Sequence, residues 1–306
     1  MDTPETSNTQ TETTEPAVYT PGTAIVRPAE AHLLKVRDDV MAQMQALRDR
    51  LSNEEEKKIV EKFIRFNNPN KRGREEMPVK WTIPVLRIVQ GMTRERPQNS
   101  QVGDLYTSTQ QLLNSPVQVT ALYMHEANRM FNMGGGEDAP SCFSPDARLG
   151  DPYGWCHACP HLPKFKNSAN KATSCDNGFL FTVLTSDLKV LIVEFYKTSR
   201  RVGVKFDDYL NNSEEMWDHW FQLKSDKMAY DGKEWYVFKV VPTNTETPIY
   251  VRETASILHT MVATQRKMML QEHYDQVHKA TAAMEAVAEN VPNGTVIPDE
   301  DPTGIL

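Results

Sequence analysis

The stretch CFSPDARLGDPYGWCHACPHLPKFKNSANKATSC, residues 142–175, contains all four cysteines of this 306-residue chain. Two of them form the turn Cys156-His157-Ala158-Cys159, and Cys142 and Cys175 stand on either side of it. Thiolates gathered around a Cys-x-x-Cys turn form the donor set of a structural, tetrahedral zinc site. The sequence therefore predicts a zinc ion held by Cys142, Cys156, Cys159 and Cys175, in a closed shell that leaves no position for catalysis.

Three other arrangements of these cysteines compete with zinc. Two disulfides would need an oxidising compartment, yet residues 1–22 lack the charged-then-apolar pattern of a secretory signal. A redox pair would use only Cys156 and Cys159 and would leave the outer two without a role. Four unrelated buried thiols would be scattered along the chain.

The composition of the metal shell and the form of its loops stay open at this point. His157 or His161 can replace an outer cysteine, which would give a shell of three cysteines and one histidine. The segments 143–155 and 160–174 are longer than a minimal zinc finger needs, so we expect two loops that the metal pins at their bases.

The composition places the chain among soluble proteins that keep some flexible sequence. Hydrophobic residues make up 39% and charged residues 25%. No apolar run approaches the roughly 20 residues that cross a bilayer. We therefore expect an intracellular protein with no membrane partner, in a compartment where thiols stay reduced.

Charge is distributed unevenly along the chain. The net charge is −7, and residues 1–26 and 280–306 carry acidic residues without any lysine or arginine. Residues 156–205 instead carry eight basic and three acidic side chains. A basic centre between acidic ends is typical of a protein whose middle contacts a polyanion.

Changes in composition divide the chain into five parts. We predict a disordered tail at 1–26, a helical arm at 27–67, the main domain at 78–250, a C-terminal helix at 251–289 and an acidic tail at 290–306. Within the arm, apolar spacing predicts a helix over 30–51, and Ser52-Asn53-Glu54-Glu55 predicts the start of a second helix that ends near Phe66. This arm is either a hairpin packed on the main domain or a partner-binding or self-association arm.

The main domain is expected to contain short strands joined by tight turns. The predicted strands are 81–90, 104–107, 117–124, 179–184, 189–196, an edge strand at 202–206, 221–223 and 235–241, with a short helix at 213–219. Turns are predicted at Thr185–Leu188 and at Asp231-Gly232. With the flanking helices, this pattern predicts an α+β fold built on a small closed β-barrel with an inserted metal loop.

Sequence signatures of enzymes are absent. The chain has no phosphate-binding loop, dinucleotide fingerprint, GxSxG or HExxH motif. Asp207-Asp208 is an acidic pair that could ligate Mg²⁺ in a nuclease, although such pairs are commonly turn residues. We therefore expect a protein without catalytic residues.

Nucleic-acid binding has the stronger pattern, because cations and aromatic residues alternate at 196–206 and around the cysteines. Cations neutralise phosphates and aromatic rings stack on unpaired bases. The candidate contacts are the cations Lys164, Lys166, Lys197, Arg200, Arg201 and Lys205, with Tyr153, Trp155, Phe165 and Tyr196 as stacking candidates.

Several segments in a fixed order carry a resemblance to a known family. They are Ile83–Gln90, Gly103–Tyr106, the apolar strand at 117–124, the four cysteines with Cys159-Pro160, the strand at 179–184 and Tyr196–Ser199. Over residues 80–241 the chain resembles a family of bacteriophage single-stranded DNA-binding proteins with a zinc-containing insertion in an OB-type barrel. The resemblance implies an OB-like domain that coats single-stranded DNA without sequence preference in replication or recombination, in the host cytoplasm if a phage encodes it. The four-cysteine shell departs from the better-known phage helix-destabilising proteins, whose shell includes a histidine.

The C-terminal tail adds to this resemblance. It contains Asp299, Glu300 and Asp301 and ends in Ile305 and Leu306. Acidic tails with an apolar tip recruit replication or recombination proteins in such families, so the resemblance implies these partners, and self-association stays possible. The alternative is an interaction protein whose zinc ribbon acts on RNA polymerase or on the replication machinery.

Overall fold

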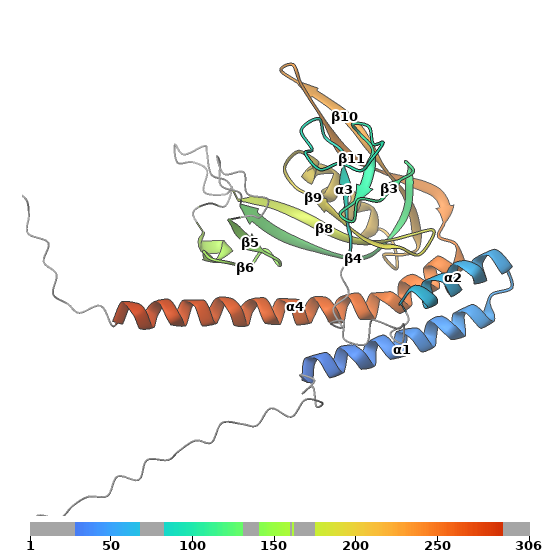
Figure 1. Cartoon of the computed structure of the whole chain (residues 1–306), viewed down its shortest axis with the longest axis horizontal. Coiled ribbons are helices and arrows are strands. Elements are labelled where there is room, and N and C mark those ends of the chain that lie inside the picture. Colours follow the sequence, from blue (N-terminus) through green and yellow to red (C-terminus); the bar gives the residue numbers. More distant parts are fainter. Residues whose placement is uncertain (1–27, 68–82, 131–140, 160, 162–174, 290–306) are drawn as a thin grey trace, which may run out of the picture.

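The computed structural model describes residues 28–67, 83–130, 141–159, 161 and 175–289. The two predicted tails lie outside these ranges, and so do the candidate contacts Lys164, Phe165 and Lys166 and the tail residues Asp299, Glu300, Asp301, Ile305 and Leu306. The described part has a mixed α+β fold (Figure 1).

Eleven strands and four helices make up the described ranges. The helices are α1 (Pro28–Arg50), α2 (Glu54–Asn67), α3 (Arg200–Leu210) and α4 (Ile249–Glu289), with 3-10 turns η1 (Cys156–Ala158) and η3 (Lys197–Ser199). The strands are β1 (Val85–Ile88), β2 (Leu105–Thr107), β3 (Leu112–Leu113), β4 (Val117–Met130), β5 (Cys142–Ser144), β6 (Leu149–Gly150), β7 (Gly154–Trp155), β8 (Asp176–Thr185), β9 (Val190–Phe195), β10 (His219–Tyr230) and β11 (Lys233–Glu246).

Nine of these strands form one curled sheet, eight of them in the order β11-β10-β4-β8-β9-β1-β2-β3 and β5 beside β4, while β6 and β7 form a separate two-stranded sheet. Among the described strands only β1 and β9 pair in parallel. The predicted closed barrel is wrong in one respect, since no pairing between β11 and β3 closes the sheet in the described ranges. Side chains bridge part of the gap: the Gln90 amide donates to the Tyr236 carbonyl at 2.8 Å and accepts from the Tyr236 N–H at 3.0 Å.

The predicted helical arm is present and packs on the sheet. Asn53 caps α2 by accepting hydrogen bonds from the backbone N–H groups of Glu55 and Glu56. Buried residues of α1 and α2, such as Met44 and Phe63, share one apolar cluster with β4, β8 and the first half of α4. The arm is thus a pair of helices packed against the sheet, and Figure 1 shows these helices along one side of it.

Helix α4 is 41 residues long and extends beyond the sheet. The predicted C-terminal helix is thus confirmed, with its start at Ile249. Despite this length, neither α4 nor another helix in the described ranges combines the length and hydrophobicity that a bilayer span requires.

Helix α3 fills the curve of the sheet where an edge strand was predicted. Phe206 is fully buried, stacks on Phe181 at 4.4 Å between ring centroids and meets Phe221 edge-on at 4.8 Å. Gly203 permits this approach, because a Cβ atom there would lie 2.8 Å from Cβ of Phe195. The prediction of a strand over 202–206 is wrong, since helical spacing of Gly203, Phe206 and Leu210 buries more apolar surface than alternation does.

Three further expectations need correction. Residues 213–218 form turns and not a helix, and His219 already belongs to β10. The strand predicted at 81–90 is reduced to Val85–Ile88 in the described ranges, whereas the strand predicted at 117–124 continues to Met130. The segment 143–155 is not a plain loop, since it contains β5, β6 and β7.

Replacing Phe206 by alanine should remove the central contact of the inner core. We expect a loss of about 3–5 kcal/mol in the free energy of unfolding, because the side chain is fully buried among aromatic rings. Urea titration followed by circular dichroism measures this loss. The control Lys205→Ala lies on the exposed face of the same helix and should change stability by less than about 0.5 kcal/mol; equal effects of the two variants would contradict the assigned packing.

Candidate metal centre and nucleic-acid interface

The far end of β4 brings the two outer cysteines together. Met130 of β4 pairs with Cys142 on one side, while its neighbour Arg129 pairs with Asp176 on the other side. Cys175 directly precedes Asp176, so both outer cysteines flank the same strand end. Met130, Cys142 and Cys175 accordingly form one small buried cluster.

The β6–β7 hairpin returns the inner pair to this strand end. Phe143 and Asp151 exchange backbone hydrogen bonds, and the Cys156 N–H donates to the Arg148 carbonyl at 2.7 Å. Gly150 lies between the thiols: a Cβ atom there would lie 3.0 Å from Sγ of Cys142 and 3.7 Å from Sγ of Cys156. The Cys159 N–H donates to the Cys156 carbonyl, which closes the Cys-x-x-Cys turn.

All four thiols are free, buried and close enough to influence one another. Burial, together with repulsion between its thiolate and the other three thiols, raises the pKa of Cys175 to about 12. Burial likewise raises the pKa of Cys142 to about 11, to which Cys156 and Cys159 contribute. The four donors that the sequence predicted therefore lie in one neighbourhood.

The thiols are nevertheless not at ligand spacing. No three His, Cys, Asp or Glu side chains of the described ranges are arranged as ligands of one ion. The raised pKa values of Cys142 and Cys175 mean that these two thiols are protonated at neutral pH, and neutral thiols have no electrostatic reason to converge on a point without a cation. The donor set and the glycine that makes room for it fit a soft divalent metal. His157 is exposed and next to Trp155, at 5.9 Å between ring centroids, and His161 is 5.3 Å from Tyr153 by the same measure.

Two of the predicted cations of 197–205, Lys197 and Arg200, lie beside the residues that follow Cys175. Lys197 forms an ion pair with Asp176 at 3.4 Å, and the Arg200 side chain donates to Asn177 at 3.0 Å. Both partners directly follow Cys175. The Arg200 guanidinium also lies 5.3 Å from the centroid of the Phe179 ring.

The start of α3 adds a positive end to this surface. Arg200 and Arg201 form its first turn, which contains no acidic residue, and Lys205 follows one turn later. All three side chains are exposed. A helix N-terminus carries a partial positive charge, so the helix and its side chains act in the same direction on an anion.

Of the predicted stacking residues, only two of the described three are at the surface. Tyr153 is 50% exposed and Trp155 is 49% exposed. Tyr196 is only 5% exposed, and the Arg129 guanidinium covers its ring at 3.5 Å from the centroid. Gly178 makes room for that ring, because a Cβ atom there would lie 2.4 Å from Tyr196. The expectation that Tyr196 stacks on a base does not fit this buried position.

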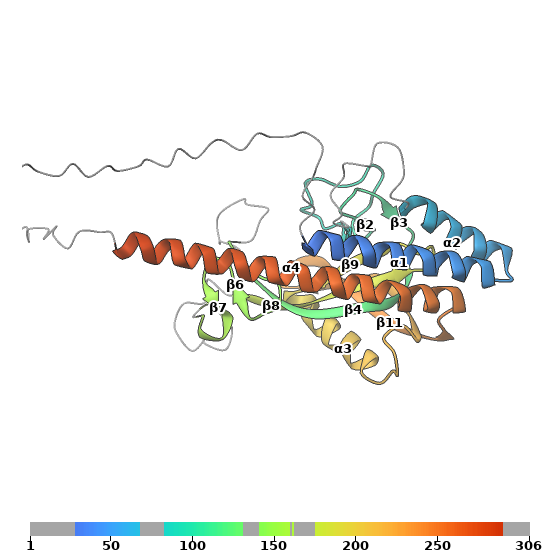
Figure 2. The ribbon, with the colours of Figure 1, turned by 90° about the horizontal axis from the view of Figure 1, so that it is seen from below.

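Sequence reasoning missed the contacts that hold the cysteine segment against α4. The Tyr274 hydroxyl donates to Asp146 at 2.6 Å, and a ring nitrogen of His273 lies 2.9 Å from the Leu149 carbonyl. The Arg266 guanidinium donates to the Pro145 carbonyl. Figure 2 shows β6 and β7 beside the half of α4 that carries these residues. No local pattern in the sequence announces these contacts, since they join residues more than 120 positions apart.

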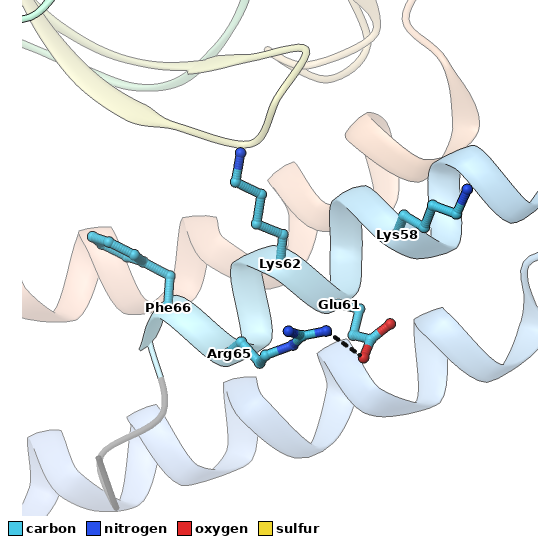
Figure 3. Close-up of a pocket in the computed structure, with 5 residues that line it drawn as sticks. All are labelled: Lys58, Glu61, Lys62, Arg65 and Phe66. Carbon is cyan, nitrogen blue, oxygen red and sulfur yellow. Dashed lines mark hydrogen bonds and ion pairs between the residues drawn. The ribbon is translucent and has the colours of Figure 1, made fainter. Parts of the chain in front are cut away.

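Two other features stand apart from this region. A surface pocket on α2 is lined by Lys58, Glu61, Lys62, Arg65 and Phe66 (Figure 3). Two of its three cations already have carboxylate partners, at Glu55 and Glu61. In the last turns of α3, burial raises the pKa of Asp207, to which Asp208 and Glu126 add by repulsion.

Neither a protein-family model, nor a curated protein, nor a solved structure matches this chain.

A half-buried histidine of β4, His125, should make the fold sensitive to acid. Both ring nitrogens of His125 are buried without a hydrogen-bond partner in the described ranges. Burial, together with the nearby Arg266, lowers the pKa of His125 from 6.5 to about 3, and Asp146 acts in the opposite direction. The folded protein thus holds His125 neutral, while the unfolded chain protonates it below 6.5. The stabilisation is complete above pH 6.5 and is lost as the pH falls toward 3.

We expect His125 to account for about 2 kcal/mol of the stability lost between pH 7 and pH 5. Urea titrations of the protein and of His125→Phe at both pH values measure this share, because the variant removes the titrating group and keeps a ring. If stability falls by the same amount between the two pH values in both proteins, folding does not shift the pKa of His125 and the prediction is wrong.

Proposed function

We propose that this protein binds single-stranded DNA without sequence preference, through an OB-like domain that a structural zinc ion stabilises. The curled sheet with α3 in its curve is compatible with a barrel of this kind. The function needs no catalytic group: cations hold the phosphates, and exposed rings stack on unpaired bases.

One observation supports this proposal most directly. Segments distant in the sequence, 175–177 and 197–200, meet so that Lys197 and Arg200 are fixed at the edge of the cysteine cluster. Arg200 is held by Asn177 and Phe179, which restricts its conformers before any ligand binds. A pre-positioned cation loses less conformational entropy on binding a phosphate.

Cys142, Cys156, Cys159 and Cys175 would hold the zinc ion. The ion would neutralise the charge of four buried thiolates. It would also cross-link chain segments that are otherwise held by few apolar contacts. Asn177 and Asp176 follow Cys175 directly, so fixing this cysteine also fixes the residues that hold Arg200 and Lys197. Zinc binding thus supports the cationic surface without taking part in it.

Binding to single-stranded oligo-dT should weaken steeply with salt. Each phosphate contact contributes a slope of roughly −0.7 to the logarithm of affinity against the logarithm of salt concentration. The double variant Arg200→Glu/Arg201→Glu should bind more weakly and should have a slope shallower by about 1.4, because two contacts are lost. Fluorescence anisotropy at several salt concentrations measures both quantities.

A charge-matched control uses Lys58→Glu/Lys62→Glu on α2, which changes the net charge equally and should keep nearly all of the affinity. Equal losses in both double variants would indicate a net-charge effect and no site at α3. Complete absence of oligo-dT binding by the unmodified protein would contradict the proposed function and favour an interaction protein that contacts polymerases.

The metal proposal is tested independently of DNA. Purified protein should contain about one zinc per chain by elemental analysis, since four thiolates complete one tetrahedral shell. Cys156→Ser should lose the metal and destabilise the cysteine segment, whereas Ser144→Ala in the adjacent strand should retain it. A metal content near zero in protein purified without chelators would contradict the zinc site.

A further inference from the structure

An aromatic surface joins the cysteine segment to α4. Trp155 of β7 meets Tyr274 of α4 edge-on, with 6.5 Å between ring centroids and an interplanar angle of 65°. His157 and His278 extend this row on either side, at 5.9 Å from Trp155 and 6.5 Å from Tyr274. Half of the indole surface remains exposed, at 49%.

The row is fixed in place and does not depend on a ligand to form. The Tyr274 hydroxyl donates to Asp146 at 2.6 Å, and Asp146 in turn accepts from the backbone N–H groups of Arg148 and Leu149. The phenol ring is therefore anchored to the cysteine segment at one end and to α4 at the other. An anchored ring presents its neighbour Trp155 at small conformational cost.

A cation stands beside the rings. Arg148 lies on the same hairpin as Trp155, since its carbonyl accepts from the Cys156 N–H at 2.7 Å and its neighbour Leu149 pairs with Trp155. The hydrogen bond to Asp146 and burial raise the pKa of Tyr274 to about 12. The Arg148 side chain is exposed and forms no hydrogen bond or ion pair with other described residues. The exposed Trp155 ring and the Arg148 guanidinium thus belong to the same short hairpin.

The chemistry of this surface favours an unpaired nucleotide over an apolar peptide. The exposed large hydrophobic residues of the described cysteine segment are Phe143, Tyr153 and Trp155, all of them aromatic. No exposed Leu, Ile, Val or Met accompanies these rings in the described part of that segment. Indole and imidazole faces stack on any base, and a nearby guanidinium donates hydrogen bonds to the phosphate.

We propose that Trp155, Tyr274 and Arg148 form a second contact for the DNA strand, in which a base stacks on Trp155 and its phosphate binds Arg148. This inference rests on the proposed function and extends its binding surface from α3 onto α4. The two surfaces adjoin one cluster of thiols: Trp155 precedes Cys156, and Asn177, which holds Arg200, lies two residues after Cys175. Tyr274 acts as a positioning residue for the indole.

The test compares two exposed aromatic residues of the same segment. Trp155→Ala should weaken oligo-dT binding by about tenfold or more, since one stacked base contributes about 1–3 kcal/mol. Phe143→Ala is the matched control, because its ring is exposed but has no ring contact with the row in the described structure, and it should bind within about twofold of the unmodified protein. Zinc content and thermal midpoint of each variant establish that the segment is folded.

A second measurement needs no variant. Oligo-dT that contains 5-iododeoxyuridine should cross-link under ultraviolet light to peptides covering 148–157 or 270–280. The second contact is wrong if both alanine variants bind oligo-dT as well as the unmodified protein does. It is also wrong if the cross-links fall only outside these peptides. Either result would leave the α3 site unaffected. Unmodified protein that does not bind oligo-dT at all would overturn both.

Discussion

The antiparallel pairing of β4 with β8 is the constraint on which the rest of this structure depends. It runs from Val119↔Thr185 to Arg129↔Asp176, and it crosses both the apolar core and the edge of the cysteine cluster. A shift of one residue would turn every side chain of β4 to the opposite face. The same shift would separate Cys142 from Cys175, because each is placed by its own neighbour on β4.

A bulge in this pairing lets one strand serve two environments. The register shifts between Ala121 and Tyr123, which places Leu122 and Tyr123 together against the outer helices. Before the bulge, Val119 and Ala121 face the inner core that α3 fills. An extra residue in one strand bends it and increases its twist. The curl of the sheet, and hence the position of its far end near α4, follows from this local irregularity.

Local patterns predicted the helices of the arm, α4 and most strands, since each of these segments buries one face with a regular period. They failed at α3, where Val202, Val204 and Phe206 alternate as in a strand. The deciding contacts lie elsewhere in the chain: Phe181 and Phe221 surround Phe206 from two different strands. The alternation of apolar residues in a segment of five does not reveal these contacts. Such a short segment fits both the helical and the strand period.

In the candidate site, too, local patterns predicted some features, whereas others depend on contacts between distant parts of the chain. Clustering in the sequence singled out the four cysteines and the cations near α3, and the structure places both groups around Asp176 and Asn177. No sequence pattern indicated that Arg129 would cover Tyr196 or that α4 would hold the cysteine segment. These contacts depend on the path of α4 across the molecule, which is a property of the whole fold.

The position of each cation bears on how strongly it acts on a phosphate. The net charge of −7 would repel DNA if it acted from the centre of the molecule, but charges separated by more than a Debye length, about 8 Å at physiological salt, are largely screened. Only the local surface then matters. Lys197 must give up part of its ion pair with Asp176 to bind a phosphate, whereas Arg200 is held by a neutral amide and keeps its full charge. Both cations lie at the same edge of the cysteine cluster, but a carboxylate competes with the ligand and an amide does not. Arg200 is therefore better placed than Lys197 to discriminate a nucleic acid from solvent anions.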